Sequence, residues 1–374
     1  MLNQRLIEFA GLLLFCTVLK SSEAIAQCSY EWRRDASSQW IDGNLVTAVS
    51  VLPTVASCPN GIRLVIATES SDQFGNLGGL ITIRDDSSWF SLPGYSDGLI
   101  SSFTYYEDEL YVGGFFASVG GTPASHIAKW TGSSWATVGL GTNGNVYALT
   151  TFGGELIVAG SFTMAGGAPA NRVAAWNGTT WKALGSGFND TVYSLAVWNN
   201  TLVACGDFTT ADEQSAGRVA AWDGTSWQPL GTGCNGTVYT ACEHLGDLFI
   251  GGTFTAAGGT AADRIARWNG TVWTPLISDG GQLVPQYYVT SMRSFGDRLI
   301  AGGQFRAQSG GGPAIPIADW DGSAWQPLSS PGINSALYVS ALDQFNGELM
   351  VGGYFFEVSG MAAFGLASWN GTMW

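Results

Sequence analysis

The sequence has few charged residues, and basic residues are especially scarce. Lys and Arg number 15 against 29 Asp and Glu, which gives a formal net charge of -14 at pH 7, and charged residues make up only 12% of the chain. A chain of this composition offers no basic stripe that could neutralise phosphate groups. We therefore expect no nucleic-acid partner and no attraction to an anionic membrane surface.

Histidine is scarcer still, with His126 and His244 as the only two copies. The cysteines show no metal-ligand spacing with them, and a site rich in imidazole cannot be built from two well-separated histidines. We therefore expect no metal and no cofactor. No Ser, Cys or paired-carboxylate constellation stands out either, so the sequence predicts no catalytic residues and makes an enzyme the less favoured reading.

Long hydrophobic runs are absent after the first 26 residues. The chain begins with Arg5, an apolar run over 9–19 and a small-residue end at Ala24-Ile25-Ala26. This order predicts a cleaved signal peptide over 1–26, because the run is too short to be a comfortable membrane span. A retained signal anchor is the alternative. We expect a secreted, periplasmic or cell-surface protein that does not insert into the membrane after cleavage.

Cysteines are also few once the signal peptide is removed. The mature chain over 27–374 would keep Cys28, Cys58, Cys205, Cys234 and Cys242. An odd number in an exported protein predicts disulfides with at least one thiol left over. Cys28 with Cys58 is one plausible pair, and Cys234 with either Cys205 or Cys242 is the other.

Glycine and tryptophan, in contrast, are abundant, with 52 and 16 copies. Together with 46% apolar residues, they favour an all-β protein of short strands and tight turns. Four tryptophans recur at intervals of 46 residues, at Trp135, Trp181, Trp227 and Trp273. A period of this length is typical of a propeller or a repeat array.

One unit, over 146–187, shows the pattern of the others. Two alternating apolar segments, 146–149 and 156–159, are separated by a Gly-Gly turn and followed by Gly160 and Phe162. A Gly-rich and Ala-rich loop leads to a third segment over 172–176. Asn177-Gly178 then joins it to a fourth over 180–184, and Asn-Gly between two strands is a strong hairpin signal. The unit is predicted to be a four-stranded antiparallel sheet.

Similar units open near residues 46, 99, 146, 192, 238, 289 and 339, and the first of them lacks the Gly pair. A sheet that is apolar on both faces is stable only against neighbours, so we predict a seven-bladed β-propeller. We expect glycine pairs where strands approach the adjacent sheet closely, and Phe and Trp between sheets. The fragment 30–43 is expected to close the ring, with Ser38 to Asp42 as the fourth strand of the last sheet. A chain that continues past Trp374 is the alternative.

The repeated residues resemble kelch repeats in their small pair, downstream aromatic residue and Trp. They are more similar to the propeller repeats of the fungal cortical polarity-marker family and of uncharacterised exported bacterial proteins. Segments 250–255 and 264–273 carry this resemblance, which covers roughly residues 30–374. It implies a secreted or surface propeller used for interaction, and it supplies no catalytic residues.

A candidate binding face follows from the expected strand order. The connections between strands two and three and between units share one face, and they are longer and more variable than the turns on the other face. Segments 117–125, 209–217, 306–316 and 277–288 belong to it. Function concentrates on such loops. The candidate ligand contacts there are His126, Arg172, Phe188, Arg218, Arg264, Tyr287, Tyr288 and Phe364.

We therefore predict an exported interaction module that binds an extracellular protein or a polysaccharide on this face. A hydrolase or lyase acting on polysaccharide at the same face, or a structural surface component, is the alternative. The basic residues His126, Arg172, Arg218 and Arg264 form a possible cationic rim, each four residues before a Trp. The more favoured explanation is that each pairs locally with an acid or a turn carbonyl.

Overall fold

The computed structural model describes residues 46–52, 63–71, 77–84, 89–276, 283–307, 315–329, 332–334, 338–363 and 365–374. The expected signal peptide, the expected closing strand and Phe364 lie outside this part of the chain. Every regular element in it is a β-strand. No helix in these ranges is long and apolar enough to cross a membrane.

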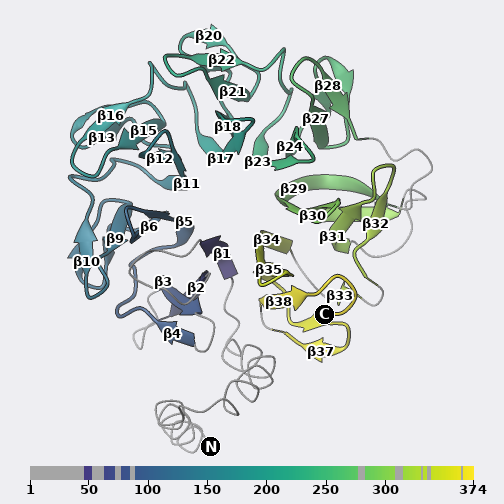
Figure 1. Ribbon diagram of the computed structural model, residues 1–374, viewed down its shortest axis with the longest axis horizontal. Coiled ribbons are helices and arrows are strands. Elements are labelled where there is room, and N and C mark those ends of the chain that lie inside the picture. Colours follow the sequence, from purple (N-terminus) through teal and green to yellow (C-terminus); the bar gives the residue numbers. More distant parts are fainter. Residues whose placement is uncertain are drawn as a thin grey trace, which may run out of the picture.

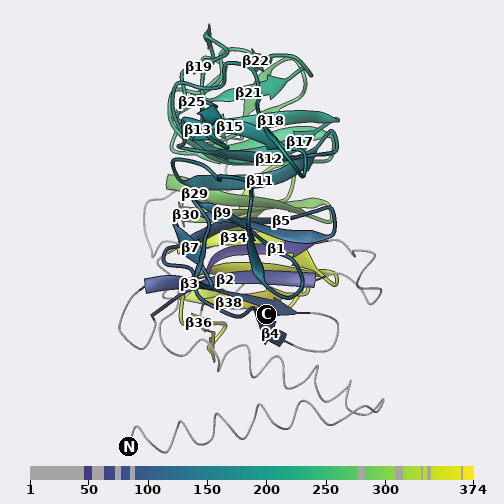
Figure 2. The ribbon, with the colours of Figure 1, turned by 90° about the vertical axis from the view of Figure 1, so that its left-hand side faces the viewer.

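The strands form antiparallel sheets around a common axis, so the protein is an all-β propeller (Figures 1 and 2). Six of the sheets have four strands and are called blades 1 to 6 in chain order. The strands of blades 1 to 3 are β1 (Val46–Leu52), β2 (Arg63–Ser71), β3 (Leu77–Arg84) and β4 (Trp89–Ser91); β5 (Ile100–Tyr106), β6 (Glu109–Gly114), β9 (Ile127–Trp130) and β10 (Trp135–Thr137); and β11 (Val146–Phe152), β12 (Glu155–Gly160), β15 (Val173–Trp176) and β16 (Trp181–Ala183).

Blades 4 to 6 continue the same order. Their strands are β17 (Val192–Trp198), β18 (Thr201–Gly206), β21 (Val219–Trp222) and β22 (Trp227–Pro229); β23 (Val238–His244), β24 (Asp247–Gly252), β27 (Ile265–Trp268) and β28 (Trp273–Pro275); and β29 (Leu283–Phe295), β30 (Arg298–Ala307), β31 (Ile315–Trp320) and β32 (Trp325–Pro327). The predicted antiparallel four-stranded unit is confirmed.

The predicted count of seven complete blades is corrected to six. The remaining sheet, called the C-terminal sheet, has three strands: β34 (Tyr338–Phe345), β35 (Glu348–Tyr354) and β38 (Leu366–Trp369). In blades 2 to 6 a fourth strand begins five residues after the last residue of the third strand, as Trp181 follows Trp176. Trp374 holds the position equivalent to Trp181, five residues after Trp369.

The first strand of each sheet lies closest to the axis (Figure 1). β1 lies beside β5 on one side and beside β34 on the other, so the six blades and the C-terminal sheet surround the axis without a break. Each first strand carries a register shift near its start, such as the one between Val146 and Ala148 in blade 3. This shift is a β-bulge, which places one extra residue on the first strand and changes the direction of its side chain.

The glycine pairs mark close approaches, as predicted. A Cβ on Gly251 would lie 2.7 Å from Val289 Cγ1 in the next blade, and a Cβ on Gly302 would lie 2.7 Å from Val339 Cγ1 in the C-terminal sheet. The second glycine of each pair meets its own blade instead, as Gly252 does at the carbonyl of Thr237. Adjacent sheets therefore approach closely at a position that holds a small residue: Gly251 in blade 5 and Gly302 in blade 6, and Ala159 and Cys205 in blades 3 and 4.

Aromatic side chains fill the wider space between sheets. Phe162 and Phe208 are 1% and 0% exposed, and the same position in the other repeated units is equally buried. The fourth-strand tryptophans also fasten one blade to the preceding one. Trp227 Nε1 donates to the Leu184 carbonyl at 3.0 Å, and Trp181 Nε1 donates to the Val138 carbonyl at 3.0 Å. The tryptophan period thus reflects inter-blade hydrogen bonds as well as packing.

In blades 2 to 5 and in the C-terminal sheet, the connections between strands two and three are regular hairpins rather than free loops. They contain the short strands β7 (Ser118–Val119), β8 (Thr122–Pro123), β13 (Met164–Ala165), β14 (Ala168–Pro169), β19 (Thr210–Ala211), β20 (Gln214–Ser215), β25 (Ala256–Ala257), β26 (Thr260–Ala261), β36 (Glu357–Val358) and β37 (Met361–Ala362), with β33 (Ile333–Asn334) beside β36. The preceding inter-blade segment bonds to each hairpin. Asn143 Oδ1, for example, accepts the N–H groups of Thr163 and Met164, both at 2.8 Å.

Segments 117–125 and 209–217, which belong to the expected binding face, are therefore ordered hairpins. Asp97, Asn189 and Asn235 repeat the contacts of Asn143 in their own blades. The segment 277–288 is likewise not all loop, because β29 begins at Leu283 and pairs with β30 from there. The face that carries these hairpins is therefore an ordered surface whose contacts repeat from blade to blade.

Candidate functional site

An arc of aromatic side chains lies on the face formed by the hairpins and the inter-blade connections. It consists of Phe115, Tyr147, Tyr193 and Tyr239, one from each of blades 2 to 5. The ring centroids of Phe115 and Tyr147 are 5.1 Å apart, those of Tyr147 and Tyr193 5.1 Å, and those of Tyr193 and Tyr239 5.4 Å. Each aromatic side chain therefore contacts the next, in edge-to-face or tilted geometry. We call this group the aromatic arc.

The β-bulge explains why tyrosines reach this position. Tyr147, Tyr193 and Tyr239 are the second residues of their first strands and sit at the register shifts. Ser101, Thr290 and Ser340 hold the equivalent positions in blade 2, blade 6 and the C-terminal sheet. Without the extra residue, each of these side chains would follow the ordinary alternation of a strand into the space between sheets.

Hydrogen bonds fix the middle of the aromatic arc. Tyr193 Oη donates to Asp207 Oδ2 at 3.1 Å, and the Thr237 hydroxyl donates to Asp207 Oδ1 at 2.5 Å. Burial, followed by the negative charge of Asp207, raises the pKa of Tyr193, so its phenol stays protonated near neutral pH. Asp207 is the charged side chain in direct contact with the arc, and both of its oxygens are occupied.

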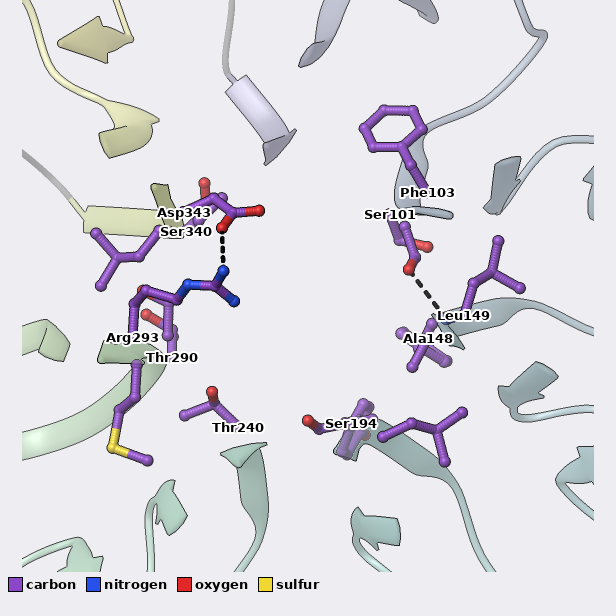
Figure 3. Close-up of a pocket in the computed structure, with 18 residues that line it drawn as sticks. Ser101, Phe103, Ala148, Leu149, Ser194, Thr240, Thr290, Arg293, Ser340 and Asp343 are labelled. Carbon is purple, nitrogen blue, oxygen red and sulfur yellow. Dashed lines mark hydrogen bonds and ion pairs between the residues drawn. The ribbon is translucent and has the colours of Figure 1, made fainter. Parts of the chain in front are cut away.

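The arc borders a cavity on the propeller axis, which has a volume of about 300 Å³. Tyr147 and Tyr193 line it together with residues from the first strands of blades 2, 5 and 6 and of the C-terminal sheet. Figure 3 shows Ser194, Thr240, Arg293 and Asp343 around the central opening, whereas Phe103 and Leu149 point away from it into the packing between sheets. The cavity wall is therefore largely polar although the adjacent core is apolar.

Some of the hydroxyls on the cavity wall donate hydrogen bonds to the neighbouring sheet. Ser101 Oγ donates to the Val146 carbonyl at 2.6 Å, and Thr290 Oγ1 donates to the Val339 carbonyl at 2.7 Å. Other hydroxyls remain available. The hydroxyls of Ser194 and Thr240 have no hydrogen-bond partner among the described residues. Ser291 Oγ also lacks a partner in the same part of the structure, but it is buried against Gly302 and is not accessible from the cavity.

An ion pair lies on the cavity wall farther from the arc. Arg293 Nη2 is 2.7 Å from Asp343 Oδ1, and the Arg293 side chain is 45% exposed whereas that of Asp343 is 8% exposed. Both residues are four positions after the first-strand valines Val289 and Val339, so they lie deeper than the bulge. The cavity is thus lined by aromatic rings and by a self-neutralised charge pair, of which Figure 3 shows the Arg293–Asp343 pair.

The cationic rim makes local contacts. Arg172 and Arg218 donate to the carbonyls of Phe162 (3.2 Å) and Cys234 (2.9 Å), and Arg264 lies 3.9 Å from Asp263. These contacts agree with the favoured explanation of local pairing. The same residues and His126 also have positive φ, between 63° and 71°, at the start of the third strand. Burial lowers the pKa of His126, so this residue adds little positive charge at neutral pH.

Phe188 is a core residue rather than a surface contact. Its side chain is 3% exposed, and its ring centroid lies 4.3 Å from that of Phe208 and 4.8 Å from that of Trp227. Tyr287 is 54% exposed and Tyr288 is half-buried, both in β29 immediately before Val289. Tyr288 thus lies near the start of the bulge, and no ring contact joins either tyrosine to the aromatic arc in the described structure. Phe364 lies outside the described residues.

A second aromatic group lies at the same end of the C-terminal sheet. The Tyr338 and Tyr354 rings stack with centroids 6.4 Å apart, and Phe356 meets Tyr354 edge-to-face at 5.1 Å. Sequence reasoning missed this group and the arc, although the 46-residue interval between Tyr147, Tyr193 and Tyr239 was a visible signal.

The remaining titratable groups do not gather into a second site. No group of three or more His, Cys, Asp or Glu side chains that could hold a metal occurs among the described residues. Cys205, Cys234 and Cys242 are free thiols, so the expected disulfide among them is not found, and Cys28 and Cys58 lie outside the described ranges. Burial raises the pKa of the Cys242 thiol to about 12, which makes it a poor nucleophile.

Comparison with known proteins gives the fold alone. No family model and no curated protein matches the sequence. Among solved structures, the β-propeller domain of the Trilobed protease from Pyrococcus furiosus is similar with a TM-score of 0.43 and 10% identity, over 77% of this chain and 96% of that one. The acylaminoacyl peptidase of Pyrococcus horikoshii is similar with a TM-score of 0.39 and 10% identity, over 85% of this chain and 59% of that one. These similarities concern the fold and assign no family, and the resemblance to kelch repeats stays a prediction.

Proposed function

We propose that this protein is an exported binding module whose ligand docks on the aromatic arc, at the mouth of the axial cavity. The observation that carries the proposal is the arc itself. Four aromatic side chains from four blades contact one another beside a polar cavity, and Phe115 among them is 39% exposed. Aromatic side chains around a concave site with a few polar groups are typical of binding sites. The ligand class is an extracellular protein or a carbohydrate.

The proposed location differs from the loops that the sequence favoured. The hairpins are held by repeated Asn and Asp contacts, and the basic residues pair with local carbonyls or acids, so both serve the scaffold. The arc tyrosines are not needed to form the scaffold, because serine or threonine occupies the same bulge position in blade 2, blade 6 and the C-terminal sheet. Export rests on the first 26 residues of the sequence.

A glycan and protein array tests this proposal. The mature chain should retain at least one ligand, and the double variant Phe115→Ala with Tyr147→Ala should lose it. Val272→Ala is the matched control, because Val272 is 55% exposed in the turn between β27 and β28, away from the arc. Ligand retention that is equal in the wild type and the double variant would contradict the proposal.

We also propose, as the finer account of the fold, that Ser38 to Asp42 pairs with β38. Among the described residues β38 pairs with β35 alone, whereas the third strand of each blade also pairs with a fourth. In blades 2 to 6 the fourth strand begins with a tryptophan that pairs with the last residue of the third strand. Trp374 already holds that position beside Trp369, so we expect the N-terminal segment to pair with the next residues of β38, Ala367 and Ser368. Ile41→Pro should lower the thermal midpoint and Ile41→Ala should have a smaller effect, since only proline removes a backbone donor. Equal midpoints for Ile41→Pro and the wild type would refute it.

A further inference from the structure

The wall of the axial cavity narrows the chemical class of the ligand. Hydroxyl groups dominate the wall, with Ser101, Ser102, Ser194, Thr240, Thr290, Ser291 and Ser340 contributing from five of the sheets. The charged side chains on the wall, Arg293 and Asp343, neutralise each other. A site of this composition satisfies a ligand that is rich in hydroxyls and carries no net charge.

The unpaired hydroxyls point to the same conclusion. The hydroxyls of Ser194 and Thr240 have no hydrogen-bond partner among the described residues, and both residues lie beside the central opening (Figure 3). Leaving a hydroxyl without a hydrogen bond in a site from which a ligand excludes water is unfavourable. Hydroxyls from two different blades therefore offer hydrogen bonds that the protein itself does not use.

The aromatic arc supplies the complementary apolar surface. Phenyl and phenol rings bind the C–H face of a pyranose by dispersion, and their hydroxyls reach its polar rim. Tyr147 and Tyr239 have no hydrogen-bond partner for their hydroxyls among the described residues. A cavity of about 300 Å³ is at the small end of ligand pockets and has room for a chain end rather than for a folded partner.

The negative charge of the protein favours a neutral saccharide over an acidic one as the ligand. The whole chain carries a formal charge of -14, and Asp207 contacts the centre of the arc. Arg172 and Arg218 direct their guanidinium groups to backbone carbonyls instead of toward a ligand. An anionic ligand would approach against this field without a free cation to receive it among the arc and wall residues.

We propose that the site binds the end of a neutral saccharide chain, with one sugar in the axial cavity and the next on the aromatic arc. This inference rests on the proposed function and deepens it. The terminal sugar exchanges hydrogen bonds with Ser194, Thr240 and the Arg293–Asp343 pair. The adjoining sugar stacks on the middle of the arc, over Tyr147 and the rings of Phe115 and Tyr193 that contact it. No covalent step is involved.

Isothermal titration calorimetry of the mature chain tests the inference. The probes are neutral hexose oligosaccharides (cellohexaose, laminarihexaose, maltohexaose and mannohexaose), and an oligogalacturonate is the charged counterpart. We expect at least one neutral probe to bind in the micromolar to millimolar range and the oligogalacturonate to bind more weakly. Phe115→Ala and Tyr147→Ala should each weaken binding by about tenfold or more, whereas Tyr147→Phe should weaken it less.

Tyr95→Ala is the matched control, because Tyr95 is 48% exposed in the connection between blades 1 and 2 and belongs neither to the arc nor to the cavity wall. It should leave affinity unchanged, and all variants should keep the wild-type thermal midpoint. Affinity that is equal in wild type and both arc variants would overturn the inference, as would no binding of any neutral probe at millimolar concentration.

The two proposals fail in distinguishable ways. If no saccharide binds but an array protein is retained by the wild type and lost by the arc variants, the saccharide inference is wrong and the binding face stands. If neither a saccharide nor an array protein depends on the arc, both proposals are wrong.

Discussion

At the scale of single residues, the repeated positions serve packing between sheets, and each has an identifiable physical reason. The glycine pairs allow adjacent sheets to approach, the phenylalanines fill the space beside them, and the tryptophans donate to the preceding blade. Such residues could be predicted from the sequence because they repeat. The arc tyrosines also recur every 46 residues, but their place at the cavity could not be predicted, because they reach it through a bulge and strict period-2 alternation gives no sign of a bulge.

Gly251 offers a direct test of the close approach. In Gly251→Ala the new methyl group would meet Val289 Cγ1 at 2.7 Å, so the variant should lose about 1–3 kcal/mol of unfolding free energy. The measurement is denaturant unfolding of Gly251→Ala, Val289→Ala and the double variant. Because the smaller side chain at 289 makes room for the methyl group, the double variant should be more stable than the two single losses predict. Strict additivity would show that the two positions do not meet.

His244 predicts a pH dependence of stability. Its side chain is 5% exposed, and Nδ1 lies 2.8 Å from Ser294 Oγ. Burial lowers the pKa of His244, and the negative charge of Asp297 only partly opposes this effect. The unfolded chain therefore binds the proton more readily, so stability should be greatest above the ordinary histidine pKa of about 6.5 and should fall as pH decreases below it.

The measurement is the free energy of unfolding of wild type and His244→Gln between about pH 7 and 5. The wild type should lose more stability over this range, because glutamine has no proton to gain. His126→Gln serves as a comparison, since burial also lowers the pKa of His126. Parallel pH profiles for wild type and His244→Gln would contradict the assignment.

At the scale of elements, the sheets follow the sequence pattern closely while the connections do not. The four strands of a unit, and the Asn-Gly turn between the last two, could be predicted from alternation and turn chemistry, as Asn177 and its contacts with Thr179 and Thr180 confirm. The hairpins between strands two and three were expected to be variable. Their order depends on single Asn or Asp side chains in the preceding connection, and a contact across 20 residues leaves no local signal.

A substitution of Trp374 tests whether this residue acts as the first residue of a fourth strand in the C-terminal sheet. Its backbone follows the same turn as in the blades, with Asn370 N–H donating to the Met373 carbonyl at 3.0 Å, and its indole donates to Ser329 Oγ of blade 6. Trp374→Ala should therefore lower the unfolding free energy by about 1.5–3 kcal/mol, since the ring is half-buried against the core of this sheet.

The control is Trp374→Phe, which keeps an aromatic ring but loses the indole donor and should recover part of the loss. Chemical unfolding of the three proteins decides the matter. A Trp374→Ala variant as stable as the wild type would show that this tryptophan does not fasten the C-terminal sheet to blade 6.

At the scale of the whole molecule, a propeller built of similar units carries an asymmetric feature at its bulge positions. The scaffold residues recur around the axis, whereas aromatic residues occupy the bulge position only in blades 3 to 5, beside Phe115 in blade 2. Departure from the repeat, rather than the repeat, therefore marks the proposed site. The sequence showed which residues repeat, but not that these three tyrosines face the axis.

The most direct test of the binding face is ¹⁹F NMR of the mature chain labelled with fluorotyrosine, titrated with a ligand retained on the array. The chain has 12 tyrosines, each of which can be assigned by its own Tyr→Phe variant. We predict that the signals of Tyr147, Tyr193 and Tyr239 shift on binding, and that those of Tyr105 and Tyr106, at the opposite end of β5, do not. Shifts confined to Tyr105 and Tyr106, with the signals of the arc unchanged, would contradict the account.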